Sequence, residues 1–178
     1  MLQLVKPSGY YQQSYIDYIT ELGDEERYPF PLDFDHSDFG AMLEKISDFA
    51  RGQNLPAGYV ACETYWLVEG DELLGVANLR LTLNDNIRYC GGHIGLGIRP
   101  RFRGKGLGVE LLAQTIALAK GKGINELHIH CYKHNLASAK MIIANGGVLD
   151  SEIELDTQSN EKNQQDNAVA IIQRYRVS

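Results

Sequence analysis

Hydrophobic and polar positions in the N-terminal half of the chain alternate in ways that predict helices and strands in turn. Apolar residues recur at helical spacing over residues 10–22 and again over 39–49, where Ser37 or Asp38 is placed to cap the helix. Period-two alternation bounded by turn residues predicts strands near residues 2–5, 62–69, 72–83 and 92–98. Strands and helices mixed in this way are typical of an α/β fold.

The C-terminal half begins with a periodic segment that follows a group of glycines. One apolar stripe predicts a helix that ends near Lys120 and packs on the sheet through Val109, Leu112, Ile116 and Ala119. A strand near residues 126–132 and a second helix, opened by Asn135 and ended by Gly146-Gly147, follow it. The last two predicted strands, 148–155 and 168–177, enclose a polar loop that we expect to be mobile.

Composition narrows the class of protein. The 178 residues are 44% hydrophobic and 22% charged, which fits a single domain over residues 1–178 with a substantial core. A net charge of −6 argues against a nucleic-acid partner, and we expect a cytoplasmic protein because no membrane span or signal peptide is visible. Cys62, Cys90 and Cys131 lack the spacing of a disulfide framework or zinc site, so buried thiols are expected.

Acidic residues are concentrated between Glu21 and Asp48. This segment is either the ordinary solvated surface of two helices and their connecting loop, or an acidic wall that attracts a cationic amine. Both interpretations are open at the level of the sequence.

Residues 98–108 carry the clearest chemical pattern, Ile98-x-Pro100-x-x-Arg103-x-x-Gly106-x-Gly108. Glycines ahead of a helix let backbone N–H groups close on an anion, and the helix dipole favours negative charge there. A Walker loop is excluded because Gly104-Lys105 is followed by Gly106 and not by a hydroxyl residue. The dinucleotide fingerprint is also missed, since Val109 stands where its third glycine belongs.

The pattern resembles the acetyl-CoA signature of the GNAT N-acetyltransferase family, with Ile98 in place of valine as the one difference. The resemblance implies a three-layer fold of about seven twisted, mixed strands flanked by helices. It also implies an acetyl-CoA-dependent acyltransferase, without a metal, that moves an acetyl group to a primary amine by direct attack on the thioester. The acceptor would be a small-molecule or peptide amine, cationic if the acidic segment attracts it. A homodimer is compatible with this assignment, and a membrane partner is not expected.

The resemblance also assigns the cofactor contacts. Backbone amides from Gly104 onward would hold the pyrophosphate, with charge from Arg103 and Lys105, and a strand edge near Ile98 would receive the pantetheine arm and polarise the thioester oxygen. The expected cofactor-binding residues are Leu96, Gly97, Ile98, Arg103, Gly104, Lys105, Gly106, Leu107, Gly108, Val109, Asn135 and Ser138.

Candidate catalytic residues come from the proton transfers that the reaction needs. A base must deprotonate the attacking ammonium, and His130, which stands at the position of a frequent family glutamate upstream of Asn135, is the first candidate, followed by His93. The family tyrosine that protonates the thiolate is replaced by Ile142, so Tyr132 is the candidate acid.

Two other functions stay open at this stage. The missing tyrosine suggests a CoA-binding module without catalysis. His128 and His130 alternate onto one strand face near His134, which suggests a metal-dependent hydrolase, although no carboxylate lies at matching spacing. A structural, hydrogen-bonded role is the alternative for the histidines.

Overall fold

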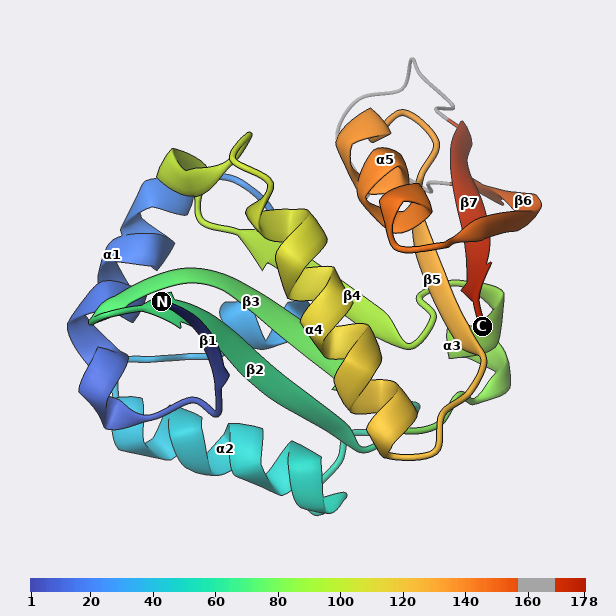
Figure 1. The fold of residues 1–178 in the computed structure, drawn as a ribbon. Coiled ribbons are helices and arrows are strands. Elements are labelled where there is room, and N and C mark those ends of the chain that lie inside the picture. The colour runs from blue at the N-terminus through green and yellow to red at the C-terminus, as the bar shows by residue number, and fades with distance from the viewer. Residues whose placement is uncertain (157–168) are drawn as a thin grey trace, which may run out of the picture.

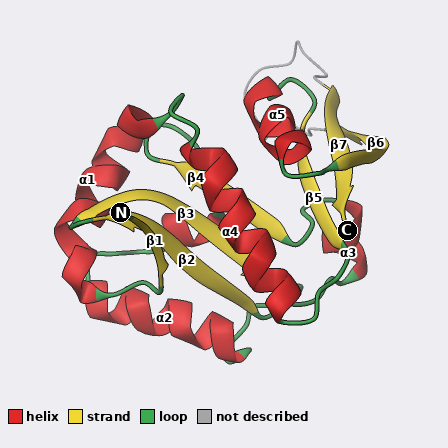
Figure 2. Cartoon of the chain, viewed as in Figure 1, coloured by secondary structure: helices red, strands yellow, loops and turns green. Residues whose placement is uncertain are grey.

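The computed structural model describes residues 1–156 and 169–178 and contains, within these ranges, seven strands in two antiparallel sheets (Figure 2). The first sheet has the order β1-β2-β3-β4 and the second the order β5-β7-β6. The strands are β1 (Leu2–Val5), β2 (Cys62–Glu69), β3 (Glu72–Arg80), β4 (Ile94–Ile98), β5 (Leu127–Tyr132), β6 (Val148–Asp156) and β7 (Val169–Val177).

Helices cover both faces of the first sheet (Figure 1). Helices α1 (Gln12–Leu22) and α2 (Phe39–Arg51) pack on one face, where Tyr15 stacks on Trp66 with ring centroids 5.4 Å apart. Helix α4 (Leu107–Gly121) crosses the other face, and α5 (Leu136–Ala144) packs beside β5. The short elements are α3 (Asp85–Tyr89) and the 3₁₀ turns η1 (Gly9–Tyr11), η2 (Phe30–Asp33) and η3 (Pro100–Phe102).

The expected fold class, with seven strands and flanking helices, is confirmed, but the strands form two sheets where one mixed sheet was expected. A single antiparallel bridge between Gly92 and Ile129 joins the two sheets, and β4 and β5 run apart from that point (Figure 1). Gly91 and Gly92 have φ values of 132° and 70°, which bend the chain just before β4. The predicted polar loop over residues 156–167 lies almost wholly outside the described residues.

Local details explain where the pattern analysis differed from the structure. Asp38 caps α2, because its Oδ1 accepts a hydrogen bond from the Ala41 amide at 2.9 Å. Helix α3 was not predicted because it is five residues long and buries none of them, so it has no hydrophobic period. Val109 is 39% exposed and lies outside the buried stripe of α4, which instead includes Leu111.

No helix of residues 1–156 and 169–178 is long and apolar enough to cross a membrane.

Candidate active site

The junction between β4 and α4 forms an open turn with main-chain donors at its end. Gly104 and Gly106 have φ values of 73° and 79°, a left-handed conformation that side-chain-bearing residues rarely adopt. Gly106 is the N-cap of α4 and therefore offers no side-chain acceptor to the first turn. The amides of Leu107, Gly108 and Val109 thus lack an intrahelical or capping partner, which is the arrangement that binds phosphate at a helix N-terminus.

Gly108 is needed for close packing. A Cβ atom at this position would lie 3.1 Å from the Met141 Sδ atom of α5 and 3.7 Å from Ile98 of β4. Asn145 also ties the two helices together, since its Nδ2 donates to the Val109 carbonyl at 3.2 Å. The first turn of α4 is therefore held rigidly between β4 and α5.

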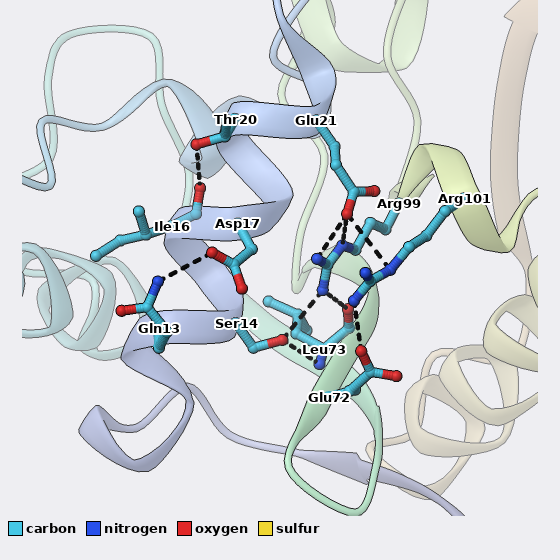
Figure 3. A network of polar contacts seen from close by, with 10 residues as sticks. All are labelled: Gln13, Ser14, Ile16, Asp17, Thr20, Glu21, Glu72, Leu73, Arg99 and Arg101. Atoms are coloured by element: carbon cyan, nitrogen blue, oxygen red, sulfur yellow. Dashed lines mark hydrogen bonds and ion pairs between the residues drawn. The ribbon is translucent and has the colours of Figure 1, made fainter.

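Arg99 is buried immediately after β4, with an exposed fraction of only 1%. Figure 3 shows its contacts with Glu21 and Ser14. Its Nε and Nη2 donate to one carboxylate oxygen of Glu21 at 2.9 and 2.6 Å, and its Nη1 donates to the Ser14 hydroxyl at 3.2 Å. Arg101 joins the same network by pairing with Glu21 at 3.3 Å and with the exposed Glu72. These contacts fasten the end of β4 to helix α1.

Arg103 also contacts the α1 side of the molecule. Its Nη1 and Nη2 form a bidentate ion pair with Glu25 at 3.2 and 2.8 Å, and its Nε donates to the Ile98 carbonyl at 2.9 Å. The hydrogen bond and charge of Arg103 lower the pKa of Glu25, although burial opposes this. Arg103 therefore shares its charge with a carboxylate, and Lys105 is the loop cation for which the described residues supply no ion-pair partner.

Strand β4 has one edge that β3 leaves open. The Arg99 amide donates to the Leu74 carbonyl and the Arg80 amide to the His93 carbonyl, so β4 uses its odd-numbered residues to bond β3. Main-chain groups alternate between the two edges of a strand, so those of Leu96 and Ile98 point away from β3. The Ile98 carbonyl on this edge accepts from Arg103, while Leu96 and Ile98 present their amides toward the space beside β5.

One face of β4 carries no side chains at its centre, and we call it the glycine face. A Cβ atom on Gly95 would lie 2.7 Å from the Tyr28 hydroxyl oxygen, and one on Gly97 would lie 2.4 Å from the Tyr28 carbonyl oxygen. Tyr28 belongs to the segment between α1 and α2. The same Cβ atom on Gly97 would lie 3.4 Å from the hydroxyl oxygen of Tyr18 in α1. The glycines therefore let the Tyr28 segment lie directly against the strand.

The two histidines predicted as bases are buried and hydrogen-bonded to main-chain amides. His130 Nδ1 accepts from the Gly91 amide at 2.9 Å, and His93 Nδ1 accepts from the His128 amide at 2.9 Å. Each neutral ring therefore carries its proton on Nε2, and the lone pair of its Nδ1 is already used. Neither ring has a free nitrogen lone pair that could take a proton from a substrate. Burial lowers the pKa of both rings to about 4. This geometry does not favour a general-base role for either residue and is what a structural histidine would show.

The histidine group does not assemble a metal site. Within residues 1–156 and 169–178, no three histidine, cysteine or carboxylate side chains lie close enough to hold an ion. His128 lies 3.6 Å from Glu126, and burial lowers its pKa, while the ring of His134 stacks on Tyr132 with centroids 5.2 Å apart.

The residues around the start of α5 occupy distinct environments. Asn135 caps the helix by accepting from the Ser138 amide at 3.1 Å, and the residue is exposed. Ile142 is only 1% exposed and belongs to the core, so the position at which the family has a tyrosine supplies no proton. Tyr132 is 41% exposed at the end of β5.

Most carboxylates of the acidic segment are already occupied. Glu21 and Glu25 pair with the arginines described above, Glu44 and Asp48 pair with Arg51, and Asp35 and Asp38 accept main-chain amides. Among the described contacts, Asp24, Glu26 and Asp33 have no such partner. The acidic wall considered above is therefore reduced to a few unpaired carboxylates.

Pattern analysis did not identify Tyr28 or the Arg99–Glu21 pair. Tyr28 lies in a loop without periodicity, and Arg99 occupies an undefined position of the motif. The signal in the sequence for this buried ion pair was the position of Arg99, directly after the apolar residues of β4.

Comparisons with known proteins agree with this geometry. The sequence matches the model of the acetyltransferase (GNAT) family over residues 18–144, which is more than half of the chain. No curated protein sequence matches significantly.

Solved structures show the same fold at low sequence identity. YncA from Salmonella typhimurium, with its cofactor acetyl-CoA, is 15% identical, with a TM-score of 0.64 over 99% of this chain and 92% of its own. RimL, a ribosomal L7/L12 alpha-N-protein acetyltransferase in complex with coenzyme A, is 14% identical, with a TM-score of 0.65 over 97% of this chain and 92% of its own. The spermidine/spermine N-acetyltransferase SpeG from Vibrio cholerae is 12% identical, with a TM-score of 0.64 over 99% and 94%. The extent of the family match shows that this chain belongs to the GNAT acetyltransferase family.

Proposed function

We propose that this protein binds acetyl-CoA at the β4–α4 junction and transfers the acetyl group to a primary amine. The observation that carries the proposal is the combination of free α4 amides behind Gly104 and Gly106 with the open edge of β4, in a member of this family. Neighbours of the same fold hold acetyl-CoA or coenzyme A, which supports the choice of cofactor.

The pyrophosphate, the pantetheine arm and the thioester of acetyl-CoA each have a chemically suited partner in this arrangement. The pyrophosphate would accept hydrogen bonds from the amides of Gly104 to Val109, with Lys105 as the nearby cation. The pantetheine arm would extend along the edge presented by Leu96 and Ile98, and Asn135 and Ser138 at the start of α5 would supply further polar contacts. The Ile98 amide would stabilise the negative charge that develops on the thioester oxygen.

The transfer itself would be a direct attack of the amine nitrogen on the thioester carbonyl. An alkyl ammonium has a pKa of about 10.4, so it must lose a proton before it attacks. Because Nδ1 of His130 and of His93 already accepts an amide proton, water is the better-supported first acceptor of that proton.

We propose a cationic amine as the acceptor, on a small molecule or an exposed peptide. Burial raises the pKa of Tyr28, and the Glu26 carboxylate is close enough for its charge to raise that pKa further, so one carboxylate without a described ion-pair partner borders the glycine face. A neighbour of the same fold is named as a spermidine/spermine N-acetyltransferase, which supports the class of acceptor.

The test is the release of CoA thiol from acetyl-CoA with a panel of amines, together with mass spectrometry of the product. The panel contains a polyamine, a neutral primary amine, a peptide with a free N-terminus and an acidic amino acid. Amine-dependent release with a mono-acetylated product is expected. Calorimetric binding of acetyl-CoA without transfer to any amine would instead identify a CoA-binding module, and release that needs no amine and is abolished by a chelator would identify a hydrolase.

The variant Gly106→Asp tests the cofactor site directly. It places a carboxylate beside the proposed pyrophosphate and forces an aspartate into a φ of 79°. We expect acetyl-CoA affinity to fall at least tenfold, since every 1.4 kcal/mol lost is a factor of ten. Gly123→Asp is the matched control, because Gly123 has a similar φ of 86° at the other end of α4. Equal cofactor affinity in folded Gly106→Asp would contradict the assignment of this turn.

A further inference from the structure

Thioester cleavage leaves an electron pair on sulfur, and this chain lacks the residue that the family places to protonate it. The CoA thiol has an acidity close to that of free cysteine, with a pKa of about 8.5, so a nearby proton donor would ease its departure. Ile142 at the family position is buried in the core and has no proton to give. The question of a donor arises only if the proposed acetyl transfer is correct.

Tyr28 brings a hydroxyl group to β4 from a different part of the fold. The hydroxyl oxygen lies 2.7 Å from where a Gly95 Cβ would stand, and the main chain of Tyr28 lies against Gly97. Both glycines are thus required by the approach of this one residue. The contact places the hydroxyl on the strand whose open edge presents Leu96 and Ile98, where the proposed function puts the reacting thioester.

The glycine face is the side of β4 opposite helix α4. Leu96 and Ile98 pack toward Leu107 and Leu111, while Gly95 and Gly97 face the Tyr28 segment. A pantetheine arm that enters beside the α4 N-terminus and follows the strand edge would therefore bring its thioester to the acceptor, and to Tyr28, on the far side of the sheet.

The Tyr28 hydroxyl is in a suitable state to donate. It makes no hydrogen bond to any of the described residues, and the residue is 43% exposed overall, although its hydroxyl end lies against β4. Burial of the hydroxyl end raises its pKa, and the charge of Arg80 opposes this only in part. The group therefore keeps its proton throughout the neutral range.

We propose that Tyr28 is the catalytic acid of this enzyme. As the amine nitrogen bonds to the carbonyl carbon, the C–S bond breaks and its electron pair goes to sulfur. Sulfur takes the proton of the Tyr28 hydroxyl, and the resulting phenolate takes a proton from the positively charged nitrogen of the new amide. The products are the neutral amide and CoA thiol, and Tyr28 ends in its starting state.

Tyr132 is the competing hydroxyl, because it also projects near the opening between β4 and β5. Its ring is stacked on His134 at an interplanar angle of 19°, at the end of β5. Tyr28 is preferred because its contacts with Gly95 and Gly97 fix its position against β4.

The experiment compares Tyr28→Phe with Tyr132→Phe, which make the same chemical change on the two sides of the opening. For Tyr28→Phe we expect kcat to fall on the order of 100-fold with unchanged calorimetric affinity for acetyl-CoA, and for Tyr132→Phe a change of less than about threefold. A second acetyl donor, the thioester of acetate with an acidic aryl thiol, separates acid catalysis by Tyr28 from a role in positioning the substrate. Its leaving group needs no proton, so the loss in Tyr28→Phe should largely disappear with this donor.

Each other result would overturn the proposal. A wild-type kcat in Tyr28→Phe would remove the role, and a large loss confined to Tyr132→Phe would transfer it to that residue. An equal loss with both thioesters, or a loss explained by a lower melting temperature, would make Tyr28 a structural residue. Failure of the wild-type protein to acetylate any amine would refute the proposed function itself and is distinguishable from all of these.

Discussion

Removing the charge of Glu21 tests how firmly the buried Arg99 holds the end of β4. Arg99 is 1% exposed, and Glu21 provides two of its hydrogen bonds at 2.6 and 2.9 Å, while the Glu21 side chain is 26% exposed. Glu21→Gln keeps an oxygen acceptor and a similar shape, so its effect reports mainly the loss of the negative charge.

The magnitude follows from the burial of the two partners. Breaking a fully buried ion pair from one side costs about 3–5 kcal/mol, and partial exposure of Glu21 reduces this to roughly 2–3 kcal/mol. At about 2–4 °C per kcal/mol for a chain of this size, the melting temperature should fall by roughly 4–12 °C. Glu72→Gln is the matched control, because the Arg101–Glu72 pair is exposed and should contribute less than about 1 kcal/mol.

Thermal unfolding followed by circular dichroism at several pH values is the appropriate assay. Burial raises the pKa of Glu21, but the hydrogen bonds and charge of Arg99 outweigh it, so the folded pKa lies below the ordinary value. The stabilisation is therefore present above the unfolded pKa of about 4.3 and is lost as pH falls through the lower folded pKa. The difference between wild type and Glu21→Gln should narrow toward pH 3. Equal melting temperatures for Glu21→Gln and Glu72→Gln at pH 7 would refute this account.

Two further predictions concern the glycine face and the histidines. Gly97→Ala should abolish amine acetylation or markedly destabilise the protein, because its Cβ would lie 2.4 Å from the Tyr28 carbonyl oxygen; kinetics and melting temperature that match wild type would show that this contact is absent in solution. Burial lowers the pKa of His93 and His130 to about 4, so these rings gain protons in the unfolded chain at a higher pH than in the folded protein. Urea unfolding should therefore show that the free energy of unfolding falls between pH 6.5 and pH 4 by up to about 3 kcal/mol for each ring. His130→Asn should flatten part of that slope with kcat nearly unchanged, whereas a loss of 100-fold or more in kcat would restore His130 as the base.

The parts of the fold that bury a regular stripe were predictable from the sequence. Helix α2 follows from its hydrophobic period and from the cap at its start, α5 follows from Asn135 at its start, and the motif of residues 98–108 located the turn before α4. The splitting of the strands into two sheets was not visible, because it depends on the backbone conformations of Gly91 and Gly92 and not on a side-chain pattern.

The site was predictable where it consists of main chain and unpredictable where it depends on distant partners. Glycines at positions 104 and 106 indicated free amides without any knowledge of the fold. That Arg103 would pair with Glu25, or that a main-chain amide would occupy Nδ1 of His130, is set by contacts between segments far apart in sequence. No local pattern records which of two candidate partners a charged or titratable group will find.

The bare face of β4 bears on how such an enzyme acquires new substrates over evolutionary time. A strand face that offers only backbone cannot discriminate between substrates through side chains, so discrimination must come from the segment lying on it, here the loop that carries Tyr28. Loops accept substitutions and insertions far more readily than central strands do. Under the proposed function, successive mutations in this loop would alter which amines are accepted while the strand edge and the helix amides remain constant. Inheritance of the cofactor site and diversification of the acceptor site would then proceed independently within one small protein.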